Sequence, residues 1–170
     1  MEGTMKVCVL TGQRQLEWTE REIPQPAAGE LQIKLEYVGI CGSDLHFFDQ
    51  GRLANWELDG PLALGHEPGG VVTAIGEGVT GFEVGDKVAI EPAVPCGKCE
   101  ACRTGHYNLC PDVKMLAIPH ERDGVFSEYC THDATMCYKL PENMDTMEGR
   151  PSGAINSRYA WNRTFRCQTW

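Results

Sequence analysis

Short runs rich in valine, isoleucine and tyrosine recur along the chain, and glycine or proline brackets most of them. This pattern is typical of β-strands separated by turns. It predicts strands at residues 5–10, 31–40, 69–76, 86–90, 126–132 and 135–140. Only residues 43–51 and 97–105 resemble short helical turns, and 19 glycines and 10 prolines make long helices unexpected. We therefore expect a mainly β domain with a few short helices, curved into a partly open barrel that leaves few strand edges exposed.

The segment GEGVTG, Gly76 to Gly81, has the glycine spacing of a dinucleotide-binding loop and follows a predicted strand. In such loops the glycines lead into a helix whose N-terminus binds phosphate. Here the next residues, FEVGDKVAI, form a further predicted strand instead. We therefore interpret the segment as a glycine turn between paired strands.

Composition then limits the class of protein. A chain of 170 residues with 42% hydrophobic content is expected to form one globular domain. It shows no apolar stretch of the roughly 20 residues that a membrane-spanning helix needs, and its N-terminus lacks the apolar block of a secretory signal. A cytoplasmic protein is the expectation. The formal net charge of −9 argues against nucleic acids and anionic membranes as partners.

Four of the nine cysteines lie close together, in PCGKCEACRTGHYNLCP: Cys96, Cys99, Cys102 and Cys110. Cytoplasmic thiols stay reduced, and an odd number cannot pair completely, so a disulfide framework is disfavoured. Four thiolates at this spacing can form a closed, structural zinc site. An iron–sulfur cluster is less favoured, because the last gap is seven residues where the ferredoxin pattern has three. Unliganded thiols are the third alternative.

A second group of metal-ligand types lies in GICGSDLH and LGHEPGG, which contain Cys41, His66 and Glu67. One thiolate, one imidazole and one carboxylate can hold zinc and leave a position free for water or substrate. Each residue alone has a simpler interpretation. A single cysteine is usually a small core residue, and a histidine beside a glutamate is usually a surface pair.

Several motifs together carry a family resemblance. GICGSDLHFF, LGHEPGGVV, VTGFEVGDKVAIEP and the four-cysteine loop, in this order, resemble the N-terminal domain of zinc-dependent medium-chain alcohol and polyol dehydrogenases. The sorbitol dehydrogenases are the subgroup that the chain resembles most. The resemblance covers about residues 5–149 and implies a GroES-like catalytic domain. It also implies two zinc ions, one catalytic and one structural, a small alcohol or polyol as substrate, NAD(P) as cofactor of the full-length enzyme, and oligomers.

By this resemblance, Cys41 and His66 bind the catalytic zinc, and Glu67 is a third or alternating ligand. Asp44 would be the carboxylate that orients the histidine. An alcohol held at such a zinc loses its proton readily and can then give hydride to the nicotinamide.

The resemblance assigns the proton relay to Ser43, with His46 as the carrier to solvent. The alternatives are a helix-capping serine and an exposed histidine. Sorbitol dehydrogenases often have an aromatic hydroxyl after this histidine, whereas this chain has Phe47. Threonine and butanediol dehydrogenases share the scaffold, so the expected substrate class is a secondary alcohol or polyol.

The composition changes at Arg150. Residues 150–170 hold 4 of the 15 basic residues and none of the 24 acidic ones, and they do not continue the family pattern. We expect a domain at residues 1–149 and a disordered tail at residues 150–170 that derives from a shifted reading frame, with no Rossmann domain in this chain. A native linker with its own role is the alternative interpretation of the tail. In the family, a glutamate at the position of Gly153 helps to hold the catalytic zinc.

Two functions follow from these expectations. The first is the N-terminal part of a zinc-dependent dehydrogenase, inactive on its own because the cofactor domain is missing. The second is a stand-alone zinc-binding β-barrel that acts as a scaffold or regulatory module. The remaining cysteines, Cys8, Cys130, Cys137 and Cys167, are expected to be ordinary core or tail thiols.

Overall fold

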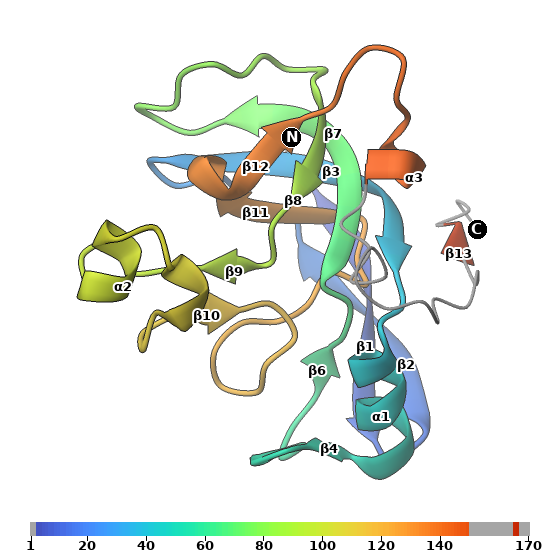
Figure 1. Ribbon diagram of the computed structural model, residues 1–170. Coiled ribbons are helices and arrows are strands. Elements are labelled where there is room, and N and C mark those ends of the chain that lie inside the picture. The colour runs from blue at the N-terminus through green and yellow to red at the C-terminus, as the bar shows by residue number, and fades with distance from the viewer. Residues whose placement is uncertain (1–2, 150–164, 167–170) are drawn as a thin grey trace.

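The computed structural model describes residues 3–149 together with the two-residue strand Phe165–Arg166. These residues form a mainly β fold with short helices, shown in Figure 1. The strands are β1 Thr4–Gly12, β2 Gln15–Glu22, β3 Glu30–Gly39, β4 Arg52–Leu53, β5 Trp56–Glu57, β6 Leu62–Ala63, β7 Glu67–Ile75, β8 Lys87–Ile90, β9 Ala93–Val94, β10 Lys114–Met115, β11 Tyr129–Asp133, β12 Cys137–Lys139 and β13 Phe165–Arg166. The helices are α1 Gly42–Gln50, α2 Glu100–Arg103 and α3 Thr146–Gly149, with 3-10 turns η1 Tyr107–Leu109 and η2 Ala134–Met136.

Two antiparallel sheets carry most of the strands. The larger has the order β11-β3-β7-β8-β12, and β13 also pairs with β3. The smaller has the order β2-β1-β6, and the short pairs β4–β5 and β9–β10 lie outside both. The described strands do not close into a complete barrel, in agreement with the expected partly open one.

The main core lies against the larger sheet, and the alternation along β3 shows why. Leu31, Ile33 and Leu35 are buried, whereas Lys34 and Glu36 are exposed. Residues two apart in a strand lie on the same face, so the apolar set of β3 packs together with that of its neighbours. The cluster includes Val72, Val88, Ile90, Leu116 and Val125. This core fixes the relative position of β3 and β7, the two strands that border the candidate site.

All six predicted strands are present, with shifted limits. β11 begins at Tyr129, three residues later than expected, and the last strand is shortened to Cys137–Lys139 because η2 precedes it. The predicted helical turn at residues 97–105 contains only the short helix α2. Strand β2 was not predicted. Half of its sequence, QLEWTERE, is charged, and most of it is exposed at the edge of the smaller sheet.

The glycine segment at residues 76–81 is a turn between β7 and β8, which pair with each other. Gly78 and Gly81 have φ values of 80° and 84°, in the left-handed region that favours glycine. A Cβ atom on Gly76 would overlap the carbonyl oxygen of Ala27. The glycines therefore serve the backbone of a turn, and the strand that follows confirms that this is no helix-opening nucleotide loop.

The expected tail lies largely outside the described residues, which omit 1–2, 150–164 and 167–170. Only Phe165–Arg166 is described there, as β13 opposite Val38 and Tyr37 of β3. The domain limit at residue 149, the shifted reading frame and the disorder of the tail therefore stay predictions, as does the interpretation of Cys167. Within the described part of the chain, no helix has the length and apolar character needed to cross a membrane.

Candidate metal centres

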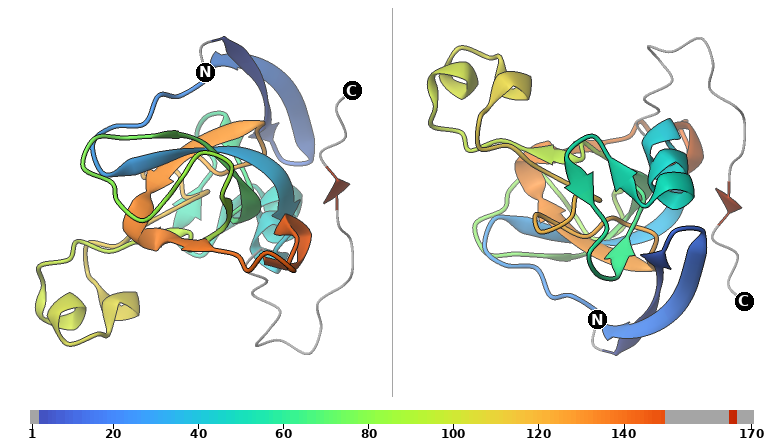
Figure 2. Two further views of the ribbon diagram at one scale, coloured as in Figure 1. Left: turned by 90° about the horizontal axis from the view of Figure 1, so that it is seen from above. Right: turned by 90° about the horizontal axis from the view of Figure 1, so that it is seen from below.

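Two groups of metal-ligand side chains come together in the folded chain, and both match groups expected from the sequence. In each, the candidate ligand atoms all lie within 4.8 Å of one another. The first group is formed by the four clustered cysteines: Cys96, Cys99, Cys102 and Cys110. They lie in a lobe, residues 95–113, that contains α2 and η1 and projects from the sheets, as both views of Figure 2 show.

The sulfur positions in the lobe fit a tetrahedral metal site. The Sγ atom of Cys102 lies 3.4 Å from that of Cys99 and 4.0 Å from that of Cys96. A zinc–sulfur distance of about 2.3 Å places neighbouring sulfurs of a tetrahedron about 3.8 Å apart. Disulfide sulfurs would be about 2.0 Å apart, and the described cysteines are free. The separations thus match ligands around one ion better than cross-linked cysteines.

The pKa shifts of the cysteine thiols in the lobe also favour a metal site. Backbone N–H groups of Lys98 and Cys99 lower the pKa of the Cys96 thiol to about 7. Desolvation, followed by the hydrogen bond with Cys99, raises the pKa of Cys102 to about 12. Thiols this close cannot all ionise, because like charges repel, unless a cation holds them. The donor set therefore fits a divalent metal such as zinc.

The second group is Cys41, His66 and Glu67, which come from the ends of two paired strands. Cys41 follows β3 and is the N-cap of α1, whereas His66 immediately precedes β7 and Glu67 begins it. The antiparallel register places Glu67 opposite Gly39, near the end of β3. Pairing of two strands distant in sequence therefore assembles this group.

Asp44 links the two chain segments that carry these ligands. Its buried carboxylate accepts hydrogen bonds from the backbone N–H groups of Cys41 and Gly65, both at 2.9 Å. One of its oxygens also lies 3.5 Å from Nδ1 of His66. A carboxylate on one ring nitrogen fixes the orientation of a ligand histidine and leaves the other nitrogen for the metal. Asp44 thus lies where it could orient His66, and its role at a metal site stays a prediction.

The ionisation of Cys41 and His66 is coupled. The hydrogen bond with His66 is the main cause that lowers the pKa of the Cys41 thiol. Burial lowers the pKa of His66, but hydrogen bonds with Asp44 and Cys41 outweigh it and raise the value to about 10. The pair thus favours a thiolate beside a protonated imidazole, and a metal ion would replace that proton on binding.

The residues predicted for the proton relay lie at different distances from the group. The hydroxyl oxygen of Ser43 is 3.5 Å from Nε2 of His66, so this side chain borders the candidate site. His46 is exposed on α1. Phe47 is 2% exposed and packs with Leu10, Leu62 and Leu64, so its ring belongs to the core.

Two glycines at the site were not singled out from the sequence. Gly65 gives Asp44 one of its hydrogen bonds, and Gly39 lies against Glu67. The only sequence signal was their position within the two motifs, GICGSDLH and LGHEPGG. The three other described cysteines, Cys8, Cys130 and Cys137, belong to neither group, and burial raises the pKa of each.

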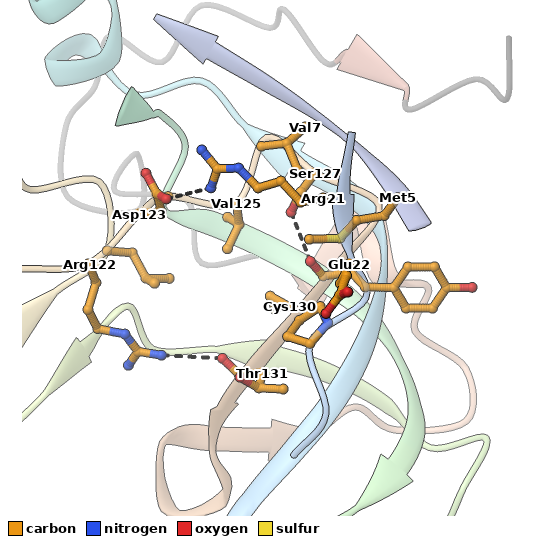
Figure 3. Close-up of a pocket in the computed structure, with 14 residues that line it drawn as sticks. Met5, Val7, Arg21, Glu22, Arg122, Asp123, Val125, Ser127, Cys130 and Thr131 are labelled. Carbon is orange, nitrogen blue, oxygen red and sulfur yellow. Dashed lines mark hydrogen bonds and ion pairs between the residues drawn. The ribbon is translucent and has the colours of Figure 1, made fainter. Parts of the chain in front are cut away.

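Two surface cavities lie away from both groups. One, of about 360 Å³, is drawn in Figure 3; Met5, Val7 and Val125 are among its lining residues, and an Arg21–Asp123 ion pair of 2.6 Å crosses it. The other, of about 440 Å³, is lined in part by the ion pair of Asp59 with His120. None of the seven candidate metal ligands lines either cavity.

The comparison with protein families decides the class of this chain. Residues 27–142 match the model of the alcohol dehydrogenase GroES-like domain. The chain belongs to the alcohol dehydrogenase family. It is 49% identical over 148 residues to an uncharacterized zinc-type alcohol dehydrogenase-like protein of Escherichia coli, and 42% identical over 144 residues to the sorbitol dehydrogenase of Bacillus subtilis.

Solved structures of the family agree with the fold. A short chain alcohol dehydrogenase from E. coli CFT073, complexed with NADH, superposes with a TM-score of 0.75 and 39% sequence identity, and 86% of this chain aligns with 41% of that one. The two relatives in sequence are matched over 86% and 85% of this chain, which spans 40% of their length. The predicted membership in the family of zinc-dependent alcohol and polyol dehydrogenases is therefore confirmed. The chain corresponds to the GroES-like part of these proteins.

Proposed function

We propose that this chain is the metal-binding catalytic part of a zinc-dependent dehydrogenase that oxidises a secondary alcohol or polyol with NAD(P). The observation that carries the proposal is the convergence of Cys41, His66 and Glu67 with Asp44 behind the histidine. The sorbitol dehydrogenase among the relatives, together with proteins described as probable D-xylulose reductases and 39–42% identical to the chain, supports a polyol as substrate.

In this proposal Cys41, His66 and Glu67 hold the catalytic zinc, which supplies a Lewis acid for the oxygen of the substrate. Asp44 keeps the imidazole in the tautomer and direction that ligation needs. We assign a part in removing the proton to Ser43 and its transfer to solvent to His46; the 3.5 Å distance from the Ser43 hydroxyl to Nε2 of His66 and the exposure of His46 support this assignment. The four cysteines of the lobe hold a second, structural zinc.

Metal content tests the two sites. We expect the purified chain to hold two zinc ions, and Cys41→Ser and Cys99→Ser to remove one each, from different sites. Elemental analysis of chelator-free preparations measures this. If none of the three proteins contains zinc, both assignments are wrong.

Activity needs a separate test, because this chain spans only 40% of its curated relatives. Residues 1–149 can be joined to the remaining part of the B. subtilis sorbitol dehydrogenase. We expect the chimera to form NADH with sorbitol or xylitol, and Cys41→Ser to abolish this. A correctly folded chimera that binds two zinc ions and oxidises neither would favour the alternative, a zinc-binding scaffold or regulatory module.

A further inference from the structure

Gly39 lies directly across from Glu67 in the pairing of β3 with β7. A Cβ atom built on Gly39 would overlap Oε2 of Glu67 and lie 3.0 Å from its Cβ. Directly opposite side chains in an antiparallel pair normally stand with their Cβ atoms about 4.5–5.5 Å apart. The Glu67 side chain instead crosses to the neighbouring strand and occupies the space that a side chain at position 39 would take.

The backbone itself does not require glycine at this position. Gly39 is the last residue of β3, and its φ is outside the left-handed region, in contrast to Gly65 with a φ of 87°. Glycine inside a strand costs conformational entropy and contributes no packing. What glycine contributes at position 39 is therefore space for the carboxylate of Glu67.

The position of that carboxylate matters because it lies with Cys41 and His66 in one potential ligand set. We propose that Gly39 is a positioning residue for the metal: its missing side chain lets the Glu67 carboxylate fold back across β3 toward the ion that Cys41 and His66 hold. This inference rests on the proposed zinc site and adds a residue that touches neither metal nor substrate.

The substitution Gly39→Ala separates a metal role from a structural one. The carboxylate oxygen that must move is the end of a flexible side chain, but the Cβ of Glu67, 3.0 Å from the added methyl group, must also give by a few tenths of an ångström. The cost of this adjustment to the fold is measured separately, by thermal unfolding. The carboxylate, however, must leave its present place. We expect the affinity of the Cys41–His66–Glu67 site to fall by about tenfold or more, as when other supporting groups of metal ligands are changed, while the four-cysteine site is unaffected.

The experiment is a titration of the 170-residue chain with Co²⁺ against a competing chelator, after zinc has filled the lobe. Absorption in the visible range reports the ligand set, and thermal unfolding reports the fold. Gly42→Ala is the matched control: it lies beside Cys41, its φ is outside the left-handed region, and a Cβ there meets no atom within 4 Å. We expect Gly42→Ala to bind Co²⁺ like the parent.

A double-mutant cycle with Glu67→Ala makes the test specific. If Gly39→Ala acts through the carboxylate, it weakens Co²⁺ binding in the parent and adds nothing in the Glu67→Ala background. Unchanged or tighter binding in Gly39→Ala, or an equal loss in both backgrounds, would overturn the inference. If Cys41→Ser also left Co²⁺ binding unchanged, the proposed catalytic site itself would fail, and the inference with it.

Discussion

His132 is the buried histidine that neither metal group uses. It is fully buried on β11, where its Nε2 donates a hydrogen bond of 2.9 Å to the carbonyl oxygen of Glu91. Its Nδ1 has no hydrogen-bond partner in the part of the chain that the structure describes. Burial, and then the positive charge of Arg122, lower its pKa from 6.5 to about 4. A second proton on this ring is therefore costly only in the folded state.

This difference predicts a dependence of stability on pH. Above pH 6.5 His132 is neutral in both states, and its contribution to stability is complete. As the pH falls from 6.5 to about 4, the unfolded chain takes up a proton that the folded chain does not, so the folded state loses up to about 3 kcal/mol. His132→Gln, which can keep the bond to Glu91, should flatten this part of the curve.

Urea unfolding at several pH values with zinc present measures the effect. Loss of metal at acidic pH lowers the stability of the parent and the variant alike, so the difference between them isolates His132. Equal slopes between pH 6.5 and 4 would contradict the assigned pKa.

At the scale of elements, the cysteine lobe differs from the sheets in how it is held. Between Cys96 and Cys110, only Cys110 is buried, and Leu109 is 67% exposed. Two helical pieces of three and four residues without a hydrophobic core are not stable by themselves. We therefore expect the structure of the lobe to depend on the metal proposed for the four cysteines, because the binding energy of such a metal becomes folding energy.

Cys99→Ser should accordingly lower the melting temperature, because three thiolates cannot complete the site. A chelator should destabilise the parent and have a smaller effect on this variant. Cys8→Ser is the control, since Cys8 is a half-buried thiol outside both groups. Circular dichroism melts measure all three proteins, and a melting curve of Cys99→Ser equal to that of the parent would refute the structural role.

Strands with alternating or continuous apolar residues, such as β3 and β7, could be predicted because burial gives them a visible pattern. The charged strand β2 could not, since it is exposed at an edge and pairs through its backbone. The order of the strands in the sheets could not be predicted either, because the alternation of apolar and polar residues in a strand does not specify which other strand it pairs with. The residues of both candidate metal groups could be selected by residue type and motif, whereas the contact of Gly39 with Glu67 exists only once β3 and β7 are in register.

At the scale of the whole molecule, the described residues supply candidate metal sites but no cofactor domain. Both main sheets are antiparallel, and no described strands form the parallel sheet with crossover helices that binds dinucleotides. Hydride transfer requires the nicotinamide and the alcohol carbon to be held about 3–3.5 Å apart. The described fold contains nothing that would do this for NAD(P).

We therefore expect the 170-residue chain alone to bind neither NADH nor NADPH at millimolar concentration and to oxidise no sorbitol, xylitol, threonine or butanediol. Cofactor fluorescence and absorbance at the NADH band measure the two properties, with B. subtilis sorbitol dehydrogenase as positive control. Saturable NADH binding by the short chain would contradict this prediction.

The pairing of β9 with β10 has a consequence for how this protein can vary. Ala93 lies opposite Met115, so the chain enters and leaves the cysteine lobe at the same point. Residues 95–113, between these strands, form one long loop whose two ends are joined by the pairing of β9 with β10. Replacing these residues by a tight turn would remove the four-cysteine group and the folding energy that its metal is proposed to supply, but β9 and β10 would still join the two ends. Changing the length of the loop costs little entropy, because the cost of closing a loop grows slowly with its length. The lobe is thus an insertion whose length can vary, whereas the Cys41–His66–Glu67 group cannot be separated from the sheet that builds it.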